Sequence, residues 1–246
     1  MRIDVRIEKA GYRKKTVLEN INFTVEGNSF TAVIGRNGSG KSTLIAAMSS
    51  LIIPKGTVLL DSVDISTLSR RERAMRISAM IQSPKRPHVT VRELVEFGRS
   101  PYLGFGKRQR DIDRIAVEAA IEKTHISNLL DSYADRISGG ELRRAYFAMM
   151  LAQDSDVALL DEPTAFMDAD YEREFFELSK KLSKTKNVIA VMHNLNMALS
   201  YADNILLLNN GRQVFFGAPS ELLKTNLIET VFSVKRFLAE GKTFFA

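Results

Sequence analysis

The segment FTAVIGRNGSGKSTLIAAMSSL, residues 30–51, decides the fold of this chain. Its apolar run at 30–34 predicts a buried strand, and residues 41–51 have the spacing and composition of a helix. Residues 35–42 satisfy the pattern G-x-x-x-x-G-K-[ST], and Thr43 follows it. A strand, a glycine-rich loop and a helix in this order are the context that a phosphate-binding loop requires.

The residue types of this loop supply the chemistry of phosphate binding. Its glycines let backbone N–H groups turn toward phosphates, and the helix N-terminus adds a partial positive charge. We expect Lys41 to reach the β- and γ-phosphates of a nucleotide, and the Ser42 hydroxyl to hold Mg²⁺. The predicted phosphate-binding residues are Gly35, Asn37, Gly38, Ser39, Gly40, Lys41, Ser42 and Thr43.

Two acidic residues, Asp161 and Glu162, end the apolar run at 157–160. Such a pair is common and could alone be a surface turn, but α/β folds place their ligands at strand ends of this kind. After a phosphate loop, Asp161 is the candidate Mg²⁺ ligand. Glu162 is the candidate base that polarises the attacking water.

A second helix start, at Ser138, Gly139 and Gly140, has the features of another anion-binding site. Glu141 gives it the spacing of a capping box, so a well-capped helix is the alternative interpretation. One nucleotide hardly needs two such sites unless the second one serves a neighbouring molecule.

Strand patterns lie at both ends of the chain, and helical patterns fill its middle. Strands are predicted at 2–7, 18–25, 157–160 and 188–192, with a hairpin over 205–216 around Asn210-Gly211. In the middle, Thr90 to Glu93 has capping-box spacing. Further along, one face of a second predicted helix is made of Ile112, Ile115, Ala116, Ala119 and Ala120. The order predicts a parallel-sheet core with a helical insertion at roughly 83–154.

The composition is that of an ordinary globular protein with a mild basic excess. Lys and Arg number 35 and Asp and Glu 29, a net charge of +6, spread along the chain. The absence of cysteine excludes disulfides and thiolate metal sites. No apolar run approaches the roughly 18 residues of a membrane span, and the first residues do not form a signal peptide. We therefore expect a cytosolic protein.

From end to end, the chain resembles ABC (ATP-binding cassette) ATPases. Its ISGGE at 137–141 resembles the LSGGQ signature, with Ile137 for the usual Leu and Glu141 for the usual Gln. Its AFMD at 165–168 resembles the D-loop and retains Asp168, although Ala165, Phe166 and Met167 are unusual there. Leu142 and Arg143 replace the more usual polar residues after the signature, and the sequence offers no physical reason for this.

The resemblance assigns roles to four further residues. Tyr12 resembles the aromatic residue that stacks on adenine, with Val17 packing nearby. Gln82 resembles the Q-loop glutamine that senses Mg²⁺ and the membrane partner, and His193 the switch histidine that contacts the γ-phosphate. The implied catalytic residues are Glu162, His193 and Gln82, and the implied metal ligands are Ser42, Gln82 and Asp161. ATP is expected to lie between the phosphate loop of one cassette and the signature and D-loop of a second one.

The implied fold class is α/β, a P-loop NTPase core of ABC type with a small β subdomain and an inserted helical subdomain. A single ABC ATPase domain is expected over 1–246. Its parts are the nucleotide-binding core at 1–82 and 155–220, the helical subdomain at 83–154, and a C-terminal helix and tail at 221–246.

Two segments, 90–104 and 217–232, resemble ATPases of iron-siderophore, haem and cobalamin uptake systems. That likeness implies two copies of the chain beneath permease subunits that dock near Gln82, on the cytoplasmic face of the inner membrane, with no nucleic acid partner. One alternative is a soluble ABC ATPase that acts on nucleic acid or ribosomes, but the chain has one cassette and no sustained heptads. The other alternative is the ATPase of an ABC exporter, which shares the catalytic motifs.

Overall fold

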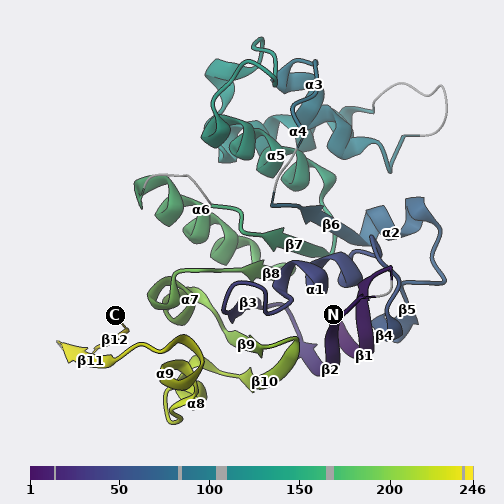
Figure 1. Cartoon of the computed structure of the whole chain (residues 1–246). Coiled ribbons are helices and arrows are strands. Elements are labelled where there is room, and N and C mark those ends of the chain that lie inside the picture. The colour runs from purple at the N-terminus through teal and green to yellow at the C-terminus, as the bar shows by residue number, and fades with distance from the viewer. Residues whose placement is uncertain (14, 83–84, 104–109, 165–168, 240–241, 246) are drawn as a thin grey trace.

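The computed structural model describes residues 1–13, 15–82, 85–103, 110–164, 169–239 and 242–245. Figure 1 shows most of the strands in one large sheet, with a separate group of helices beyond the edge of that sheet. No helix in the described part of the chain is long and apolar enough to cross a bilayer.

The large sheet joins an antiparallel part to a parallel part. The antiparallel part contains, in spatial order, β5 (Val63–Asp64), β4 (Lys55–Leu60), β1 (Arg2–Tyr12) and β2 (Lys15–Glu26). The sheet continues with β10 (Arg212–Gly217), β9 (Asn204–Asn209), β3 (Phe30–Gly35), β8 (Asn187–Val191), β7 (Val157–Asp161) and β6 (Ile77–Met80). From β9 to β6 every pairing is parallel, so the carboxyl ends of these strands meet at one edge.

The predicted strands of both parts are confirmed. The hairpin of β9 and β10 turns at Asn210 and Gly211, which both have positive φ, as a tight two-residue turn requires. β3, β7 and β8 are buried along their whole length, as the short continuous apolar runs predicted.

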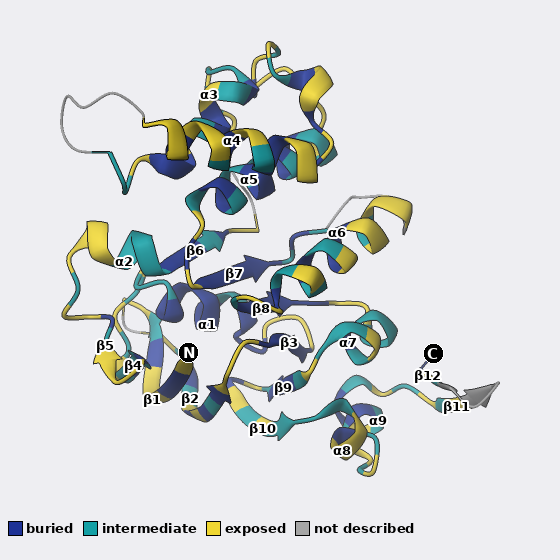
Figure 2. Cartoon of the chain, turned by 180° about the vertical axis from the view of Figure 1, so that it is seen from behind, coloured by how far each residue is buried: buried dark blue, intermediate teal, exposed yellow. Residues whose placement is uncertain are grey.

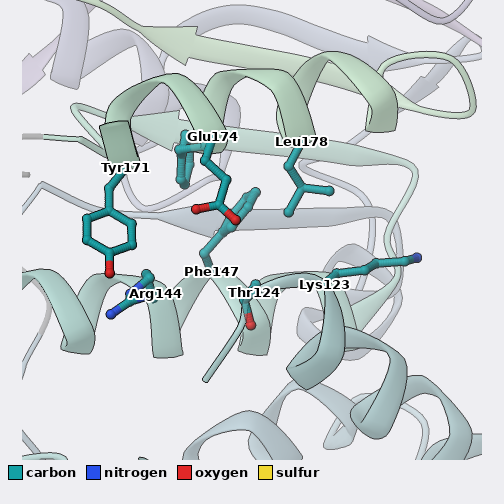
Figure 3. Close-up of a pocket in the computed structure, with 8 residues that line it drawn as sticks. Lys123, Thr124, Arg144, Phe147, Tyr171, Glu174 and Leu178 are labelled. Atoms are coloured by element: carbon teal, nitrogen blue, oxygen red, sulfur yellow. The ribbon is translucent and has the colours of Figure 1, made fainter. Parts of the chain in front are cut away.

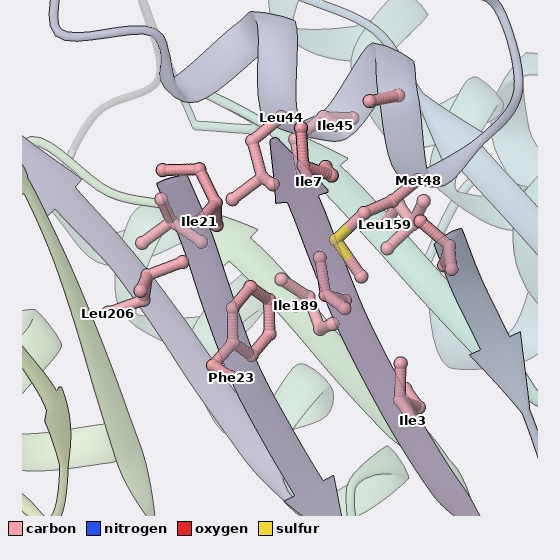
Figure 4. Packing of buried hydrophobic residues seen from close by; sticks show 14 of the residues in the cluster. Ile3, Ile7, Ile21, Phe23, Leu44, Ile45, Met48, Leu159, Ile189 and Leu206 are labelled. Carbon is pink, nitrogen blue, oxygen red and sulfur yellow. The ribbon is translucent and has the colours of Figure 1, made fainter. Parts of the chain in front are cut away.

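Helix α1 (Lys41–Met48) lies between the two parts of the sheet. Figure 4 shows Leu44, Ile45 and Met48 of this helix among side chains of both parts, such as Ile7 and Ile189. Seven of the eight residues of α1 are buried, which is the pattern of a helix covered on all sides. Each buried Leu, Ile or Met contributes about 1.5–3 kcal/mol, so this packing fixes the loop that precedes α1.

The remaining helices of the core are α2 (Arg70–Arg76), α6 (Ala169–Leu182) and α7 (Leu195–Tyr201). A second apolar cluster joins α6 and α7 to the face of the parallel strands away from α1. Within it, the rings of Phe176 and Phe30 meet edge to face with centroids 6.4 Å apart. Helices therefore cover both faces of the parallel part.

The separate group of helices contains α3 (Val91–Glu96), α4 (Asp111–Lys123) and α5 (Gly139–Gln153), with short 3-10 turns η1 (Phe97–Arg99) and η2 (Ser127–Leu129). These elements bury an apolar cluster of their own. The predicted capping boxes are confirmed, at Thr90 with Glu93 before α3 and at Ser138 with Glu141 before α5.

The apolar face that periodicity predicts is not the buried face of α4. Ile112 and Ile115 are 61% and 68% exposed, and of the predicted face only Ala120 is buried. The buried face instead carries Asp113, whose carboxylate Oδ1 accepts hydrogen bonds from Arg99 Nε and Nη2 at 3.0 and 2.9 Å. A carboxylate can be buried when it is paired with a cation. The face of α4 that contains Asp113 is therefore buried, although its sequence is polar. Figure 2 shows exposed residues along the outer side of α4.

The end of the chain differs from the expected helix and tail. It forms α8 (Pro219–Leu222), α9 (Leu227–Phe232) and a hairpin of β11 (Arg236–Ala239) and β12 (Lys242–Phe245). Ser233, in the left-handed region at φ 59°, ends α9. The Arg236 guanidinium then donates to the carbonyl oxygens of Leu223 and Thr225, both at 2.6 Å, which draws the chain back across the preceding turn.

Candidate active site

The loop at 35–43 runs from the end of β3 to the start of α1 at the carboxyl edge of the parallel strands. A Cβ at Gly35 would lie 2.3 Å from the carbonyl oxygen of Leu208, which no side chain could accommodate. Gly40 has φ 100°, and a Cβ there would lie 2.4 Å from Leu18 Cδ2. The two glycines therefore allow the loop to turn tightly against β9 and β2.

The N-terminus of α1 is open to an anion. It has no side-chain cap and no acidic residue in its first turn. Lys41, its first residue, is buried, and its Nζ donates to the carbonyl oxygens of Gly35 at 2.8 Å and Arg36 at 3.1 Å. Burial lowers the pKa of Lys41, while the charges of Glu162 and Asp161 oppose that change. The backbone amides and the ammonium group together form a cationic cradle.

Asp161 and Ser42 face each other across the same edge. The Ser42 hydroxyl donates to Asp161 Oδ1 at 3.0 Å. Burial raises the pKa of Asp161, and the hydrogen bond from Ser42 opposes this. In the described part of the chain no group of three His, Asp or Glu residues could hold a metal by itself. A cation beside Asp161 would need further oxygen ligands, such as a hydroxyl, an amide oxygen or a phosphate, which is the ligand set that Mg²⁺ prefers.

The carboxylate of Glu162 contacts the two other residues with predicted catalytic roles, Gln82 and His193. The Glu162 backbone is in the left-handed region, at φ 50°, an uncommon conformation that clusters at functional sites. Gln82 Nε2 donates to Glu162 Oε2 at 2.6 Å, and His193 Nε2 lies 2.7 Å from Glu162 Oε1. The three residues come from the ends of β6, β7 and β8, so the sheet assembles them.

Ten of the predicted residues line one open cleft of about 750 Å³. They are Val17, Asn37, Gly38, Gly40, Lys41, Ser42, Thr43, Gln82, Glu162 and His193. The cleft thus has a cationic and amide-rich floor and a carboxylate with two polar partners at its rim. This arrangement can hold a polyphosphate and orient a water molecule beside it.

Of the other predicted residues, Gly35, Ser39 and Asp161 belong to the loop and the strand end beside the cleft, and the rest lie elsewhere. Tyr12 is 49% exposed near the end of β1, and the lining of the cleft does not include it. The same is true of the segment 138–141 at the start of α5. Asp168 lies outside the residues that the structure describes. The cleft by itself is therefore only one of the two anion sites that the sequence predicts.

The start of α5 is closed by its own side chains. Ser138 N donates to Glu141 Oε2 at 2.8 Å, and Glu141 N donates to Ser138 Oγ at 3.3 Å. Hydrogen bonds that the side chain and the backbone of Ser138 donate to the Glu141 carboxylate lower its pKa. A carboxylate thus occupies the positive end of α5.

Sequence reasoning missed Arg143 as a part of this region. It is 7% exposed, and its Nη2 donates to the backbone carbonyl of Gln82 at 3.0 Å. Burial lowers the pKa of Arg143, and the charge of Glu162 opposes this, so the two charged groups are neighbours. The one signal in the sequence was that arginine stands where a different polar residue is usual.

The chain is similar to known ABC transporter proteins. Residues 18–165 match the family model described as ABC transporter. The chain is 40% identical over 229 residues to the ferric enterobactin transport ATP-binding protein FepC of Escherichia coli K12, covering 92% of this chain and 84% of that protein. It is 34% identical over 236 residues to the petrobactin import ATP-binding protein YclP of Bacillus subtilis 168, covering 94% and 93%.

Solved structures agree on the fold. An ATP-binding subunit of an ABC transporter matches with a TM-score of 0.79 at 20% identity, over 95% of this chain and 94% of that one. A bacterial Atm1-family ABC exporter with ATP bound matches with a TM-score of 0.81 at 23% identity, over 94% of this chain and 41% of that one. At such identities the likeness concerns the fold alone.

Proposed function

The chain belongs to the ABC transporter family of ATP-binding proteins, and from this premise we propose that it hydrolyses ATP to drive a membrane importer for iron-siderophore complexes. The observation that carries the choice of cargo is its similarity, over nearly the whole chain, to proteins named for ferric enterobactin and petrobactin transport. The transported complex would not contact this subunit. The residues of this subunit would bind the nucleotide and the partner proteins.

ATP would bind in the cleft at the start of α1. Lys41 would exchange its two loop carbonyls for the β- and γ-phosphates, which offer stronger, charge-assisted hydrogen bonds. Adenine would stack on Tyr12, which is exposed, with Val17 packing nearby. The remaining loop residues would donate backbone N–H groups or hydroxyls to the phosphates.

Mg²⁺ fits the oxygen donors at the strand ends. Ser42 and Asp161 already lie within hydrogen-bond distance of each other, and the Gln82 side chain reaches the adjacent carboxylate. These three residues would hold the ion. When bound, it would neutralise phosphate charge and offset the desolvation that raises the pKa of Asp161.

Hydrolysis depends on positioning and electrostatics. A water molecule polarised by Glu162 attacks the γ-phosphorus, the bond to the β–γ bridging oxygen breaks, and ADP and phosphate are released. Gln82 and His193 contact the two oxygens of the Glu162 carboxylate, so they orient the base. His193 would also contact the γ-phosphate.

A second copy of the chain would complete the site. Ser138, Gly139 and Gly140 open α5 away from the cleft, so they would bind the γ-phosphate of ATP held by the partner subunit. Glu141 and Asp168 would lie at the same junction, where the Glu141 carboxylate would compete with the phosphate. The two cassettes would pair head to tail around two nucleotides, and hydrolysis would release them.

The permease would dock in a groove beside Gln82. The groove encloses about 1430 Å³ and runs from the end of α1 past α2 and β6 to α5. Leu51, 65% exposed, and Ile81 give it apolar surface, while Arg70, Arg73 and Lys85 add positive charge. A cytoplasmic segment of a multi-spanning protein, apolar on one face and acidic at its rim, would fit this groove and hold the chain at the cytoplasmic face of the membrane.

A tagged pull-down from detergent-solubilised membranes of the native cell tests this function. The wild-type chain should recover a multi-spanning permease, and Leu51→Asp should lose it because a carboxylate would enter the apolar floor. Ile115→Asp, an equally exposed position on α4, is the matched control and should retain it. Recovery of ribosomes, nucleic acid or soluble proteins without a permease would contradict the proposal.

A further inference from the structure

Two adjacent arginines on α5 point to different parts of the molecule. Figure 3 shows Arg144 on the side of α5 that faces α6, beneath Tyr171, and its guanidinium carbon lies 4.4 Å from the centre of that ring. Arg143 is buried on another side of the helix and contacts Gln82. One arginine therefore joins α5 to α6, and the other joins it to the candidate active site.

We propose that Arg143 is a positioning residue, which fixes Gln82 and Glu162 relative to the signature helix α5. The inference rests on the proposed function, in which Glu162 polarises the attacking water. It goes further by assigning a role to a side chain that contacts neither substrate nor metal in that function.

Three consecutive contacts run from α5 through the base to His193. Arg143 Nη2 donates to the carbonyl oxygen of Gln82 at 3.0 Å, and the Gln82 side chain donates to Glu162 at 2.6 Å. The other Glu162 oxygen meets His193 at 2.7 Å. A shift of α5 would move the backbone of Gln82 and, through its amide, one oxygen of the base.

The segment that follows Gln82 is tied to the same region at two more points. Tyr146 of α5 donates its hydroxyl to the carbonyl oxygen of Lys85 at 2.8 Å. Arg86 Nη1 donates to the carbonyl oxygen of Ile137, just before α5, at 2.7 Å. Lys85 and Arg86 are thus tied to the signature segment, and Arg143 extends this tie to Gln82 itself.

The chemistry of arginine suits this position. The guanidinium is planar and always charged, and it can keep a hydrogen bond to a backbone carbonyl while its charge faces a nearby carboxylate. Arg143 meets both conditions, because it is buried beside the Gln82 carbonyl and the charge of Glu162 acts on it. Glutamine would lose the charge, and lysine would keep the charge but lose the planar array of donors.

Steady-state ATP hydrolysis by the full chain tests the proposal. Arg143→Gln should lower kcat about tenfold and change the KM for ATP less than twofold, because it displaces the base and leaves the phosphate cradle intact. Arg143→Lys should recover part of the loss. The matched control is Arg71→Gln, since Arg71 also donates to a backbone carbonyl, that of Pro101 at 2.7 Å, away from Gln82. It should stay within twofold of wild type.

A double-mutant cycle separates positioning from general damage. If Arg143 acts through Gln82, the loss in Arg143→Gln/Gln82→Ala should be smaller than the product of the two single losses. A full product would overturn the proposal, as would a kcat for Arg143→Gln within twofold of wild type. If Arg143→Gln does not fold, as judged by circular dichroism, Arg143→Lys decides by the same cycle.

The Glu162→Gln variant distinguishes this inference from the proposed function. If Glu162→Gln hydrolyses ATP at the wild-type rate, the proposed catalytic role fails, and the inference fails with it. If Glu162→Gln is inactive while both Arg143 variants are normal, the proposed function stands and only the role of Arg143 is lost.

Discussion

The N-terminus of α1 carries a cation and has no side-chain cap, whereas the N-terminus of α5 is closed by a capping box that contains a carboxylate. A glycine precedes α1, and two glycines begin α5. At both ends the first backbone N–H groups point away from the helix. At α1 the first-turn charge comes from Lys41, and at α5 it comes from Glu141. The first terminus attracts an anion by itself, and the second satisfies its own donors.

This difference indicates that the two helix termini have different roles in phosphate binding. The α1 site can bind ATP within one subunit, because its amides, ammonium group and cleft are all in place. The α5 site would bind a phosphate only when that phosphate is presented from outside, firmly enough to compete with Glu141. In the head-to-tail pair that we propose, ATP bound at α1 of one chain would be the ligand of α5 of the other chain, and this would couple the two subunits.

The largest effect is expected from Glu162→Gln, which removes the base and leaves both helix termini unchanged. Loss of a general base costs at least about 100-fold in kcat. ATP affinity should stay within about threefold, because Glu162 contributes no donor to the phosphate cradle. Single-turnover hydrolysis and calorimetric titration with ATP measure the two quantities, and Glu122→Gln on α4 is the control. Near-normal turnover would remove Glu162 from the mechanism.

Lys41→Ala should impair phosphate binding at the N-terminus of α1 and leave the N-terminus of α5 unchanged. Removing a buried ammonium group that meets phosphate oxygens should weaken ATP binding by about 100-fold. Equilibrium titration with a fluorescent ATP analogue measures this, with the exposed Lys55→Ala as control. Unchanged affinity would show that the cradle works through its amides only.

Ser138→Ala should damage the α5 terminus and spare ATP binding to the single chain. The lost cap costs about 1 kcal/mol of stability, so the melting temperature should fall by a few degrees. Hydrolysis at saturating ATP should fall about tenfold or more, because a lost hydrogen bond to a charged group costs about 1.5 kcal/mol or more. A large rise in the dissociation constant for ATP would mean that α5 binds the nucleotide of its own subunit.

Glu141→Gln should have the smallest effect, and in the opposite direction. It removes a negative charge from the positive end of α5, so ATP-dependent pairing of two chains should become about two- to fivefold tighter. Sedimentation velocity with ATP would detect the change when Glu162→Gln is compared with Glu141→Gln/Glu162→Gln. Weaker pairing would contradict the idea that Glu141 competes with phosphate.

The same carboxylate predicts a pH dependence of stability. Contacts with Ser138 lower the pKa of Glu141 in the folded chain. Its stabilising contribution is therefore present above the ordinary carboxyl pKa and is lost as the pH falls through the lowered value. The difference in unfolding free energy between wild type and Glu141→Gln should shrink in that acidic range.

The phosphate-loop region could be predicted from sequence because its pattern is local. Residues 30–51 specify strand, loop and helix by spacing alone, and the strand ends that hold Asp161 and His193 follow the rule for parallel sheets. The lining of the cleft contains only residues that sequence reasoning had selected. The proposed subdivision at 83, 155 and 221 rests on the same patterns and remains a proposal.

The missed features depend on contacts between distant parts of the chain. Periodicity grouped Ile112 and Ile115 on one face of α4, but it does not reveal that Arg99 pairs with Asp113 and allows another face to be buried. The role of Arg143 was invisible for the same reason, since its partner, the carbonyl oxygen of Gln82, lies 61 residues away. Both cases are buried charges, whose cost is decided by a partner that spacing does not reveal.

A subunit-mixing experiment tests most directly whether the two termini meet across two chains. Lys41→Ala and Ser138→Arg are each expected to be inactive, and they should regain activity when mixed, because a mixed pair keeps one intact α1 terminus facing one intact α5 terminus. Random pairing should restore about a quarter of the wild-type sites, since half of the pairs are mixed and each keeps one of two sites. A mixture that stays as inactive as its components would contradict the account.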